Sequence, residues 1–120
     1  MTIEKVRYEK LGELVLRLVP DGARKVLLYA EFEEGVIAPS LFYERGSELY
    51  YIEPDDDLFD ELHRLQQLFG SEVKAIEFEV QESKFRTHFT YGDGFDSTSN
   101  KSSRTIAILQ IHFGSAKVRY

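Results

Sequence analysis

Residues 24–53 read RKVLLYAEFEEGVIAPSLFYERGSELYYIE, and the period of this stretch decides the fold. Apolar side chains first occupy alternate positions, as on one face of a β-strand: Val26, Leu28, Ala30 and Phe32. Gly35 and Gly46 interrupt the run where tight turns are expected. We therefore predict three short strands joined as an antiparallel meander, at residues 24–33, 36–44 and 48–53. Pro39 places the second strand at an edge of the sheet or at a bulge.

The next stretch, Pro54 to Gly70, reads PDDDLFDELHRLQQLFG and predicts a helix. Its acidic start supplies an N-cap, worth about 1 kcal/mol, and complements the helix dipole. Gly70 suits the left-handed conformation that often ends a helix. The apolar residues recur at helical spacing, so we expect the helix to bury Leu58, Leu62, Leu65, Leu68 and Phe69.

Two alternating segments, 76–80 and 85–91, predict a hairpin with its turn at residues 82–83. A two-residue turn there fixes the register of the two strands. It predicts two cross-strand pairs, Glu79 with Arg86 and Glu77 with His88.

The two ends of the chain predict further helices. Residues 3–19 carry apolar side chains at helical spacing. Residues 92–103 are rich in Gly, Ser, Thr, Asn and Asp and predict a mobile surface loop. Residues 104–113 predict a last helix, capped by one of the two serines before it, although their β-branched content leaves a strand as the alternative. Residues 116–120 are expected to be a tail.

Together these elements predict an α+β fold: an antiparallel sheet of about five strands with helices packed on one face. The chain has 120 residues, so we assign residues 1–120 to a single domain in which 92–103 is the mobile loop. It has no Cys, no apolar run long enough for a membrane helix and no signal-peptide apolar region. We therefore expect a soluble, cytoplasmic protein.

Negative charge is concentrated between Glu31 and Glu61, where eleven carboxylates and one basic residue give a local balance of −10. The whole chain has a net charge of −6, so the remainder is basic. Six aromatic residues run through the same stretch. Opposite charge speeds and orients docking, and rigid aromatics anchor interfaces, so this acidic block predicts a surface that binds a basic protein. The alternative is that these are the solvated faces of ordinary strands and a helix.

We expect the partner-facing surface to draw on seven carboxylates and three tyrosines, namely Glu31, Glu33, Tyr43, Glu44, Glu48, Tyr50, Tyr51, Glu53, Asp56 and Asp60. Neighbouring strand residues point to opposite faces, so Tyr50 and Tyr51 should separate, one inward and one outward. Nucleic acid is an unfavourable partner because its phosphates would repel the carboxylates. We likewise expect no membrane partner.

The sequence offers little for catalysis or metal binding. The three histidines (His63, His88 and His112) are isolated in sequence, and there is no Cys to complete a zinc site, so we expect each histidine at the surface. There is no phosphate-binding loop, dinucleotide fingerprint or Gly-x-Ser-x-Gly elbow. We therefore expect no catalytic residue, no metal, no cofactor and no enzyme activity.

The order helix, three-strand meander, Asp-capped helix, hairpin, loop and C-terminal helix resembles that of the YezG-like immunity (antitoxin) family. The likeness covers most of residues 1–93. It is carried by KVLLYAEFEEG at 25–35, FY at 42–43, LYYI at 49–52, DDDLFDEL at 55–62, KF at 84–85 and FTYGD at 89–93.

This resemblance implies a protein that binds and neutralises a cognate polymorphic toxin domain, many of which are nucleases delivered to neighbouring bacteria. A nuclease surface is basic because it holds phosphates, so an acidic aromatic surface could occupy it. The ten residues above would then be the toxin-binding residues. The alternative is a small acidic secretion chaperone that dimerises and holds an effector client. Plugging of the toxin's active site and binding beside it both stay open, as does the oligomeric state.

Overall fold

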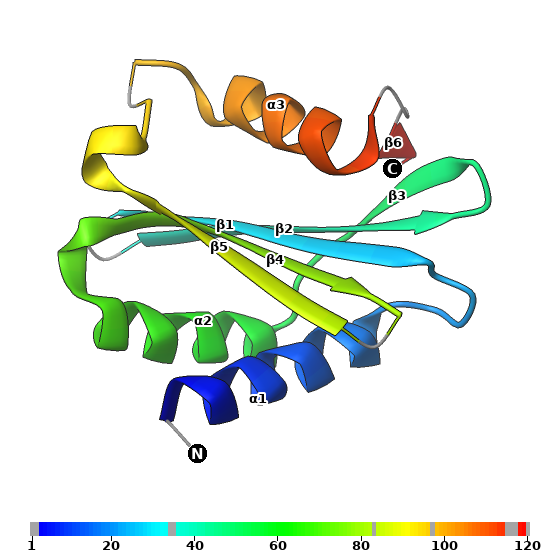
Figure 1. The fold of residues 1–120 in the computed structure, drawn as a ribbon, viewed down its shortest axis with the longest axis horizontal. Coiled ribbons are helices and arrows are strands. Elements are labelled where there is room, and N and C mark those ends of the chain that lie inside the picture. The colour runs from blue at the N-terminus through cyan, green and yellow to red at the C-terminus, as the bar shows by residue number, and fades with distance from the viewer. Residues whose placement is uncertain (1–2, 34–35, 83, 97, 115–117, 120) are drawn as a thin grey trace.

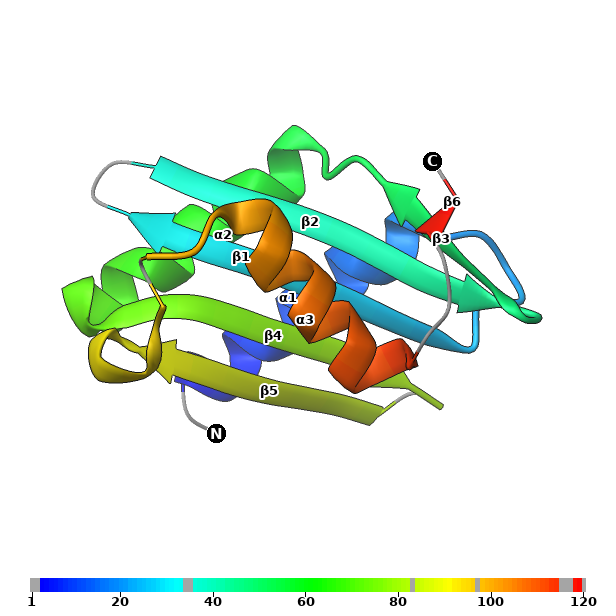
Figure 2. The same ribbon diagram turned by 90° about the horizontal axis from the view of Figure 1, so that it is seen from above.

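A single β-sheet lies between helices that cover both of its faces (Figure 1). The computed structural model describes residues 3–33, 36–82, 84–96, 98–114 and 118–119. On one face lie α1 (Ile3–Leu18) and α2 (Asp56–Phe69), while α3 (Lys101–Phe113) crosses the other (Figures 1 and 2). Two 3₁₀ turns, η1 (Gly70–Glu72) and η2 (Gly92–Gly94), complete the helical elements of these residues. The predicted α+β class is confirmed.

The sheet contains five antiparallel strands and one short parallel strand at its edge, in the order β5-β4-β1-β2-β3-β6. Their bounds are β1 (Lys25–Glu33), β2 (Val36–Arg45), β3 (Glu48–Ile52), β4 (Val73–Gln81), β5 (Lys84–Tyr91) and β6 (Val118–Arg119). The predicted five-strand antiparallel sheet and the meander are therefore confirmed. The predicted tail at 116–120 is wrong at residues 118–119, which pair with β3. Residues 116, 117 and 120 lie outside the described residues.

The predicted register of the last hairpin is confirmed. Glu79 is the partner of Arg86, and Glu77 is the partner of His88. Glu82 in the connecting turn has a φ of 51°, the left-handed conformation that a tight turn requires. Because register assigns every side chain to a face, this hairpin puts both glutamates on the side of the sheet that α3 covers.

Pro39 does not place β2 at the outer edge of the sheet, because β2 lies between β1 and β3. The pairing of β3 with β2 extends only as far as Leu41. Residues 36–40 therefore form a local edge on that side, where the missing proline N–H breaks no ladder with β3.

The α2 helix follows its sequence signals closely. Asp55 is the N-cap, and its Oδ1 accepts a 2.9 Å hydrogen bond from the Leu58 backbone N–H. Gly70 ends the helix at a φ of 74°. Three of the five residues expected in the core are buried and Phe69 is half-buried, but Leu68 is exposed. It lies one position off the apolar stripe and therefore faces solvent.

The α1 helix packs beside α2 and passes close to the edge strand β5. A Cβ atom at Gly12 would lie 2.4 Å from Cζ of Phe85. The Phe85 ring therefore occupies the space that a side chain at Gly12 would take, and any larger residue there would have to displace it. The predicted helix at residues 3–19 is thus present and ends one residue early, at Leu18.

The C-terminal helix is confirmed over the strand alternative, but it begins three residues earlier than expected. The cap is Asn100, whose Oδ1 accepts a 2.8 Å hydrogen bond from the Ser103 N–H, and not either serine. The expectation that helices cover one face holds for α1 and α2 but not for α3. The reason is that α3 turns charged side chains toward the sheet, which supplies carboxylates on that face.

Two apolar clusters result, one on each face of the sheet. The larger lies under α1 and α2 and comprises Leu11, Leu14, Val15, Val26, Leu28, Ala30, Phe32, Ile37, Leu41, Leu58, Leu62, Leu65, Val73, Ile76, Phe78 and Val80. The smaller lies under α3 and comprises Leu27, Phe42, Leu49 and Leu109. None of the described helices is long and apolar enough to cross a membrane.

Candidate functional site

Nine of the ten predicted partner-binding residues separate into three groups in the structure. Glu31 is buried under α3, and Tyr51 packs against the apolar cluster on that same face. Four residues lie at the end of the sheet where β2 turns into β3, and three lie around the beginning of α2. Glu33 stands apart from these groups, at the end of β1. Since α2 and α3 lie on opposite sides of the sheet, the acidic block does not form one continuous surface (Figure 1).

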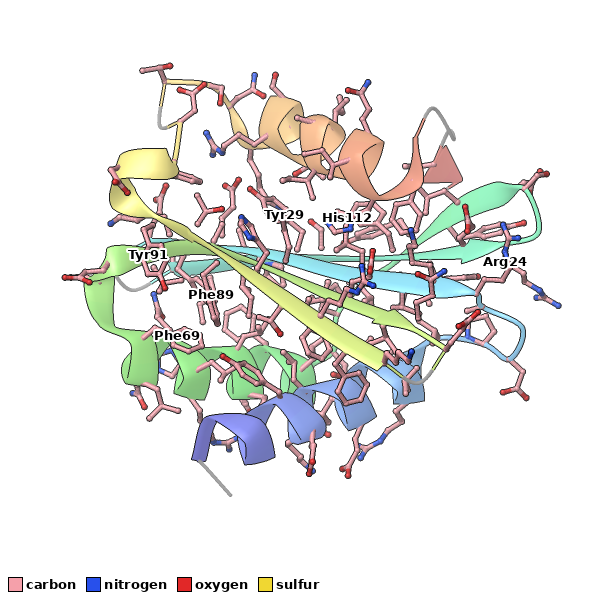
Figure 3. The ribbon with its side chains drawn as sticks, in the orientation of Figure 1. Arg24, Tyr29, Phe69, Phe89, Tyr91 and His112 are labelled. Carbon is pink, nitrogen blue, oxygen red and sulfur yellow. The ribbon has the colours of Figure 1, made fainter. Side chains whose placement is uncertain are left out.

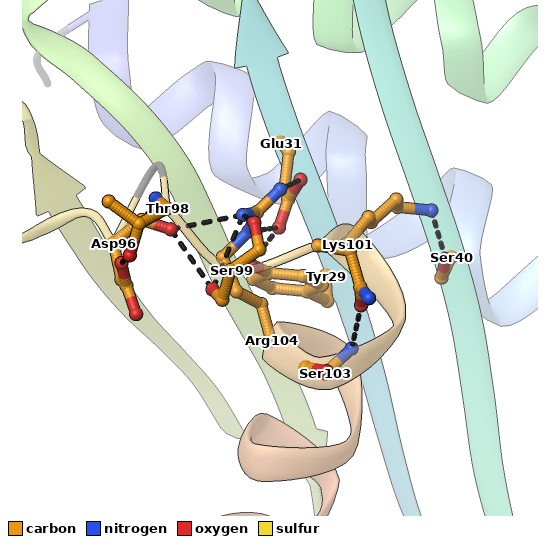
Figure 4. Close-up of polar contacts among 10 residues, drawn as sticks. Tyr29, Glu31, Ser40, Asp96, Thr98, Ser99, Lys101, Ser103 and Arg104 are labelled. Atoms are coloured by element: carbon orange, nitrogen blue, oxygen red, sulfur yellow. Dashed lines mark hydrogen bonds and ion pairs between the residues drawn. The ribbon is translucent and has the colours of Figure 1, made fainter.

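Glu31 is not part of the accessible surface, because it is only 5% exposed. Arg104 of α3 binds it with two parallel hydrogen bonds, Nε to Oε2 at 2.7 Å and Nη2 to Oε1 at 2.8 Å (Figure 4). The Tyr29 hydroxyl donates a third at 2.6 Å. Burial alone would raise the pKa of Glu31, but the hydrogen bonds from Arg104 and Tyr29 outweigh it and hold the pKa below its usual value.

The same contacts shift the pKa values of the two partners. The pKa of Tyr29 is raised well above its ordinary value, first by burial and then by its hydrogen bond to Glu31. The hydrogen bond from Arg104 to Glu31 raises the pKa of the guanidinium. Glu31 and Arg104 therefore stay charged, and Tyr29 stays protonated, throughout the physiological pH range.

At the turn between β2 and β3, acidic and aromatic residues are already engaged with neighbours. The carboxylate of Glu44 lies 3.1 Å from Arg24, whose position is shown in Figure 3. The Tyr50 hydroxyl donates to Glu48, and the Tyr50 ring stacks on Tyr43 with 5.1 Å between centroids. This end of the sheet is half-buried and partly neutralised.

Tyr51 lies on the opposite face from its neighbour, as expected. Its ring packs against Phe42 in the smaller cluster under α3, at 5.5 Å between centroids. Tyr50 stacks instead on Tyr43, which packs against the larger cluster. The predicted separation of the two tyrosines is confirmed, and only one of them shares a face with α1 and α2.

The beginning of α2 is the most acidic accessible part of the described surface. Residues 53–61 contain six carboxylates and no basic residue. Four of the six belong to exposed residues: Glu53, Asp56, Asp57 and Asp60. Phe59 stands among them with 41% of its surface exposed. We call this set, Glu53, Asp56, Asp57, Phe59 and Asp60, the acidic end of α2.

Few cations neutralise the acidic end of α2. Arg17 lies 3.8 Å from Asp57, but both side chains are more than half exposed, so the pair contributes little. Arg64 lies 3.3 Å from Glu61, which is fully buried on the inner stripe of the helix. The acids also sit where the helix dipole favours negative charge. The predicted residue Glu33 is also exposed, but it lies at the far end of β1.

Sequence reasoning missed a second cluster of charges, between α3 and β4. His112 is 15% exposed; its Nδ1 lies 2.8 Å from Glu79 Oε1 and its Nε2 lies 2.8 Å from Glu77 Oε1. Figure 3 shows His112 between α3 and the sheet. The expectation of a surface histidine is wrong here. The available signal was spacing, because Lys101, Arg104 and His112 fall on one face of a helix.

A pocket of about 430 Å³ opens between the first half of α3, η2 and the sheet. It is lined by Tyr29, Thr90, Gly94, Phe95, Asp96, Ser99, Ser103, Arg104, Ala107 and Ile108. The Arg104 guanidinium stacks on Phe95 at 4.6 Å and donates to the backbone oxygens of Asp96 and Ser99, as well as to Glu31 (Figure 4). The charged groups of this pocket are therefore committed to structural contacts.

The histidines do not form a catalytic or metal centre in the part of the chain that the structure describes. His63 and His88 are exposed, as expected. Both ring nitrogens of His112 face carboxylates, which leaves no free nitrogen to act as a base. Within the described ranges, no group of three or more His, Asp or Glu side chains is arranged to hold a metal ion.

Comparison with protein-family models gives no match, and comparison with curated proteins gives none either. The resemblance to the YezG-like immunity family therefore stays a prediction from the residues that carry it. In the part of the chain that the structure describes, the acidic end of α2 combines four exposed acidic residues with an exposed aromatic ring.

Proposed function

We propose that this protein is an immunity protein, which binds and neutralises a cognate secreted toxin domain in the cytoplasm, and that the toxin is a basic nuclease. The observation that carries the proposal is the acidic end of α2. There an exposed aromatic ring lies in the same stretch as four exposed acidic residues, and residues 53–61 contain no basic residue. A buried aromatic anchor inside a charged rim is the usual composition of a protein interface.

We propose a smaller set of toxin-binding residues than the ten expected from the sequence. We keep Glu53, Asp56 and Asp60, which are exposed at the acidic end of α2, and add Phe59 as the anchor. Glu31 is assigned instead to the attachment of α3, and Tyr51 to the smaller apolar cluster. The tyrosine pair Tyr43–Tyr50 lies on the α1 and α2 side of the sheet and supports a wider rim.

The exposed apolar residues bear on the alternative of a secretion chaperone. Among the described residues they lie on five different elements: Leu16 on α1, Val36 on β2, Phe59 and Leu68 on α2, Phe85 and Tyr91 on β5, and Ile106 and Ile111 on α3. Since α2 and α3 cover opposite faces, these side chains do not line one continuous groove for an extended client. A folded partner that meets one end of α2 fits this distribution better.

The test uses the toxin domain encoded beside the gene for this protein, with calorimetry for affinity, stopped flow for rates and survival of toxin-expressing cells. The double variant Asp56→Lys/Asp60→Lys should slow association about tenfold or more at low salt, and the loss should shrink at high salt. The double variant Glu9→Lys/Glu13→Lys replaces two exposed acids on α1, so it is the charge-matched control and should have little effect.

Phe59→Ala should weaken affinity by about 2 kcal/mol, mainly through faster dissociation, if this ring is an anchor. Leu68→Ala removes an equally exposed apolar side chain farther along α2 and serves as its control. If Phe59→Ala and Asp56→Lys/Asp60→Lys behave like their controls while circular dichroism shows an intact fold, the interface lies elsewhere. A homodimer that holds an unfolded client would support the chaperone instead.

A further inference from the structure

Polar and charged contacts accompany a small apolar contact where α3 meets the sheet. Ile108 and Phe113 of α3 pack against the smaller cluster, beside the buried Leu109. Leu109 is the only residue of α3 in the buried part of the smaller cluster, while Ile106 and Ile111 face solvent. The inner face also carries three cationic or ionisable side chains. Lys101 donates to Ser40 at 3.0 Å, Arg104 binds Glu31, and His112 meets two glutamates.

His112 must be doubly protonated to make the contacts that the structure shows. Its two ring nitrogens each lie 2.8 Å from a carboxylate oxygen, one of Glu79 and one of Glu77. A carboxylate only accepts hydrogen bonds, and a neutral imidazole has a single N–H. In the neutral ring, one nitrogen lone pair would face a carboxylate lone pair, so the double contact requires an imidazolium.

Other charged groups approach this site from β1 and β5. On β1, Lys25 Nζ lies 3.7 Å from Glu79 Oε1 and donates to the His112 backbone oxygen at 2.8 Å. On β5, His88 Nε2 lies 3.9 Å from Glu77 Oε2, but its side chain is 72% exposed. A second pocket, of about 450 Å³, opens beside His112, and Arg86 of β5 is among the residues that line it. None of these groups takes the place of the imidazolium hydrogen bonds to both glutamates.

We propose that α3 is a proton-controlled cover, closed on the sheet while His112 is an imidazolium and released at its C-terminal half when that ring loses its proton. Histidine is the side chain whose ordinary pKa lies nearest to neutrality, so a change of pH near neutrality acts on this attachment contact. Release would uncover Glu77 and Glu79 on β4. It would also remove Lys25 from the last turn of the helix, where it holds a backbone carbonyl.

The direction of the pH dependence follows from the sign of the shift. Hydrogen bonding to Glu77 raises the pKa of His112, burial opposes it, and the contact with Glu79 adds to the increase. A group whose pKa is higher in the closed state stabilises that state fully below its free pKa, which is about 6.5 for histidine. This stabilisation is lost as pH rises through the raised pKa, so the cover opens on the alkaline side.

Amide hydrogen exchange of the full chain between pH 6 and pH 9, corrected for intrinsic rates, tests the proposal. Protection of residues 105–113 should fall by about tenfold for each pH unit by which closure raises the His112 pKa. A detached helix of this length is marginal in water, so its amides should then exchange. Protection of α2 should stay constant over the same range and serves as the internal control.

Two variants and one spectroscopic measurement decide the outcome. His112→Gln should abolish the pH dependence, whereas His88→Gln, which removes the exposed histidine near the same Glu77, should preserve it. If His112→Gln does not fold, nitrogen-15 shifts of the wild-type ring give the answer, since both nitrogens should be protonated at pH 6.5. A single protonated nitrogen, or α3 protection that does not change with pH, overturns the proposal.

Discussion

The two faces of the sheet are held to their helices by different forces. Under α1 and α2 lies a cluster of sixteen buried residues, nearly all of them aliphatic. Under α3 the buried apolar set has four members among the described residues, and carboxylates of β1 and β4 meet cations of the helix. Apolar burial is insensitive to pH and salt, whereas paired charges respond to both. We call the helices α1 and α2 with the larger cluster the constant half of the molecule. We call α3 with the smaller cluster and its charged pairs the charged half.

The largest effect is expected in the constant half. Leu62→Ala should lower the free energy of unfolding by about 2–5 kcal/mol, because it leaves a cavity in the larger cluster. Urea unfolding followed by circular dichroism measures it. Leu68→Ala on the same helix should change stability by about 0.5 kcal/mol or less, since Leu68 is exposed. Equal losses in the two variants would show that α2 faces the sheet with a different side.

The next largest effect is expected from a substitution that breaks an ion pair under α3. Glu31→Gln leaves the partly buried Arg104 guanidinium facing a neutral amide and should cost about 1–3 kcal/mol. The loss should appear first as faster hydrogen exchange in α3. Glu44→Gln is the matched control, because its ion pair with Arg24 lies at the surface and should contribute about 0–1 kcal/mol. If both substitutions cost the same, the pairing under α3 does not hold the helix.

The smallest effect compares two helix caps of similar geometry. Asp55→Ala and Asn100→Ala each remove one side-chain hydrogen bond to a helix N–H and should each cost about 1 kcal/mol. Asp55→Ala should lower global stability, since α2 belongs to the larger cluster. Asn100→Ala should lower protection in α3 alone. A global loss from the second variant would mean that the two halves unfold as one unit.

The sequence predicted the constant half well because its signals agree with one another. Alternation in β1, the Asp55 cap, the Gly70 stop and the spacing of Leu58, Leu62 and Leu65 all point to the same arrangement. The hairpin register followed from a turn of fixed length. Local pattern and tertiary packing coincide there, so local reasoning was enough.

The charged half was predicted poorly because its partners are far apart in the chain. Arg104 meets Glu31, and His112 meets Glu77 and Glu79, so neither end of a pair identifies the other. Charged residues are normally assigned to solvent, which placed Glu31 and His112 on the surface. On the outer side of α3 the opposite occurs: Ile106 and Ile111 are exposed, although apolar residues are normally assigned to the core.

The order of the strands also bears on how the chain folds during synthesis. The central strand β1 pairs with β2, which begins three residues after β1 ends, but its other neighbour, β4, arrives only after α2 has been made. Until Gln81 leaves the ribosome, one long apolar edge of β1 is open to pairing with another chain. A nascent fragment that ends after Phe69 should therefore aggregate or engage chaperones. One that ends after Tyr91 has its central sheet complete and, of the described elements, lacks η2, α3 and the edge strand β6.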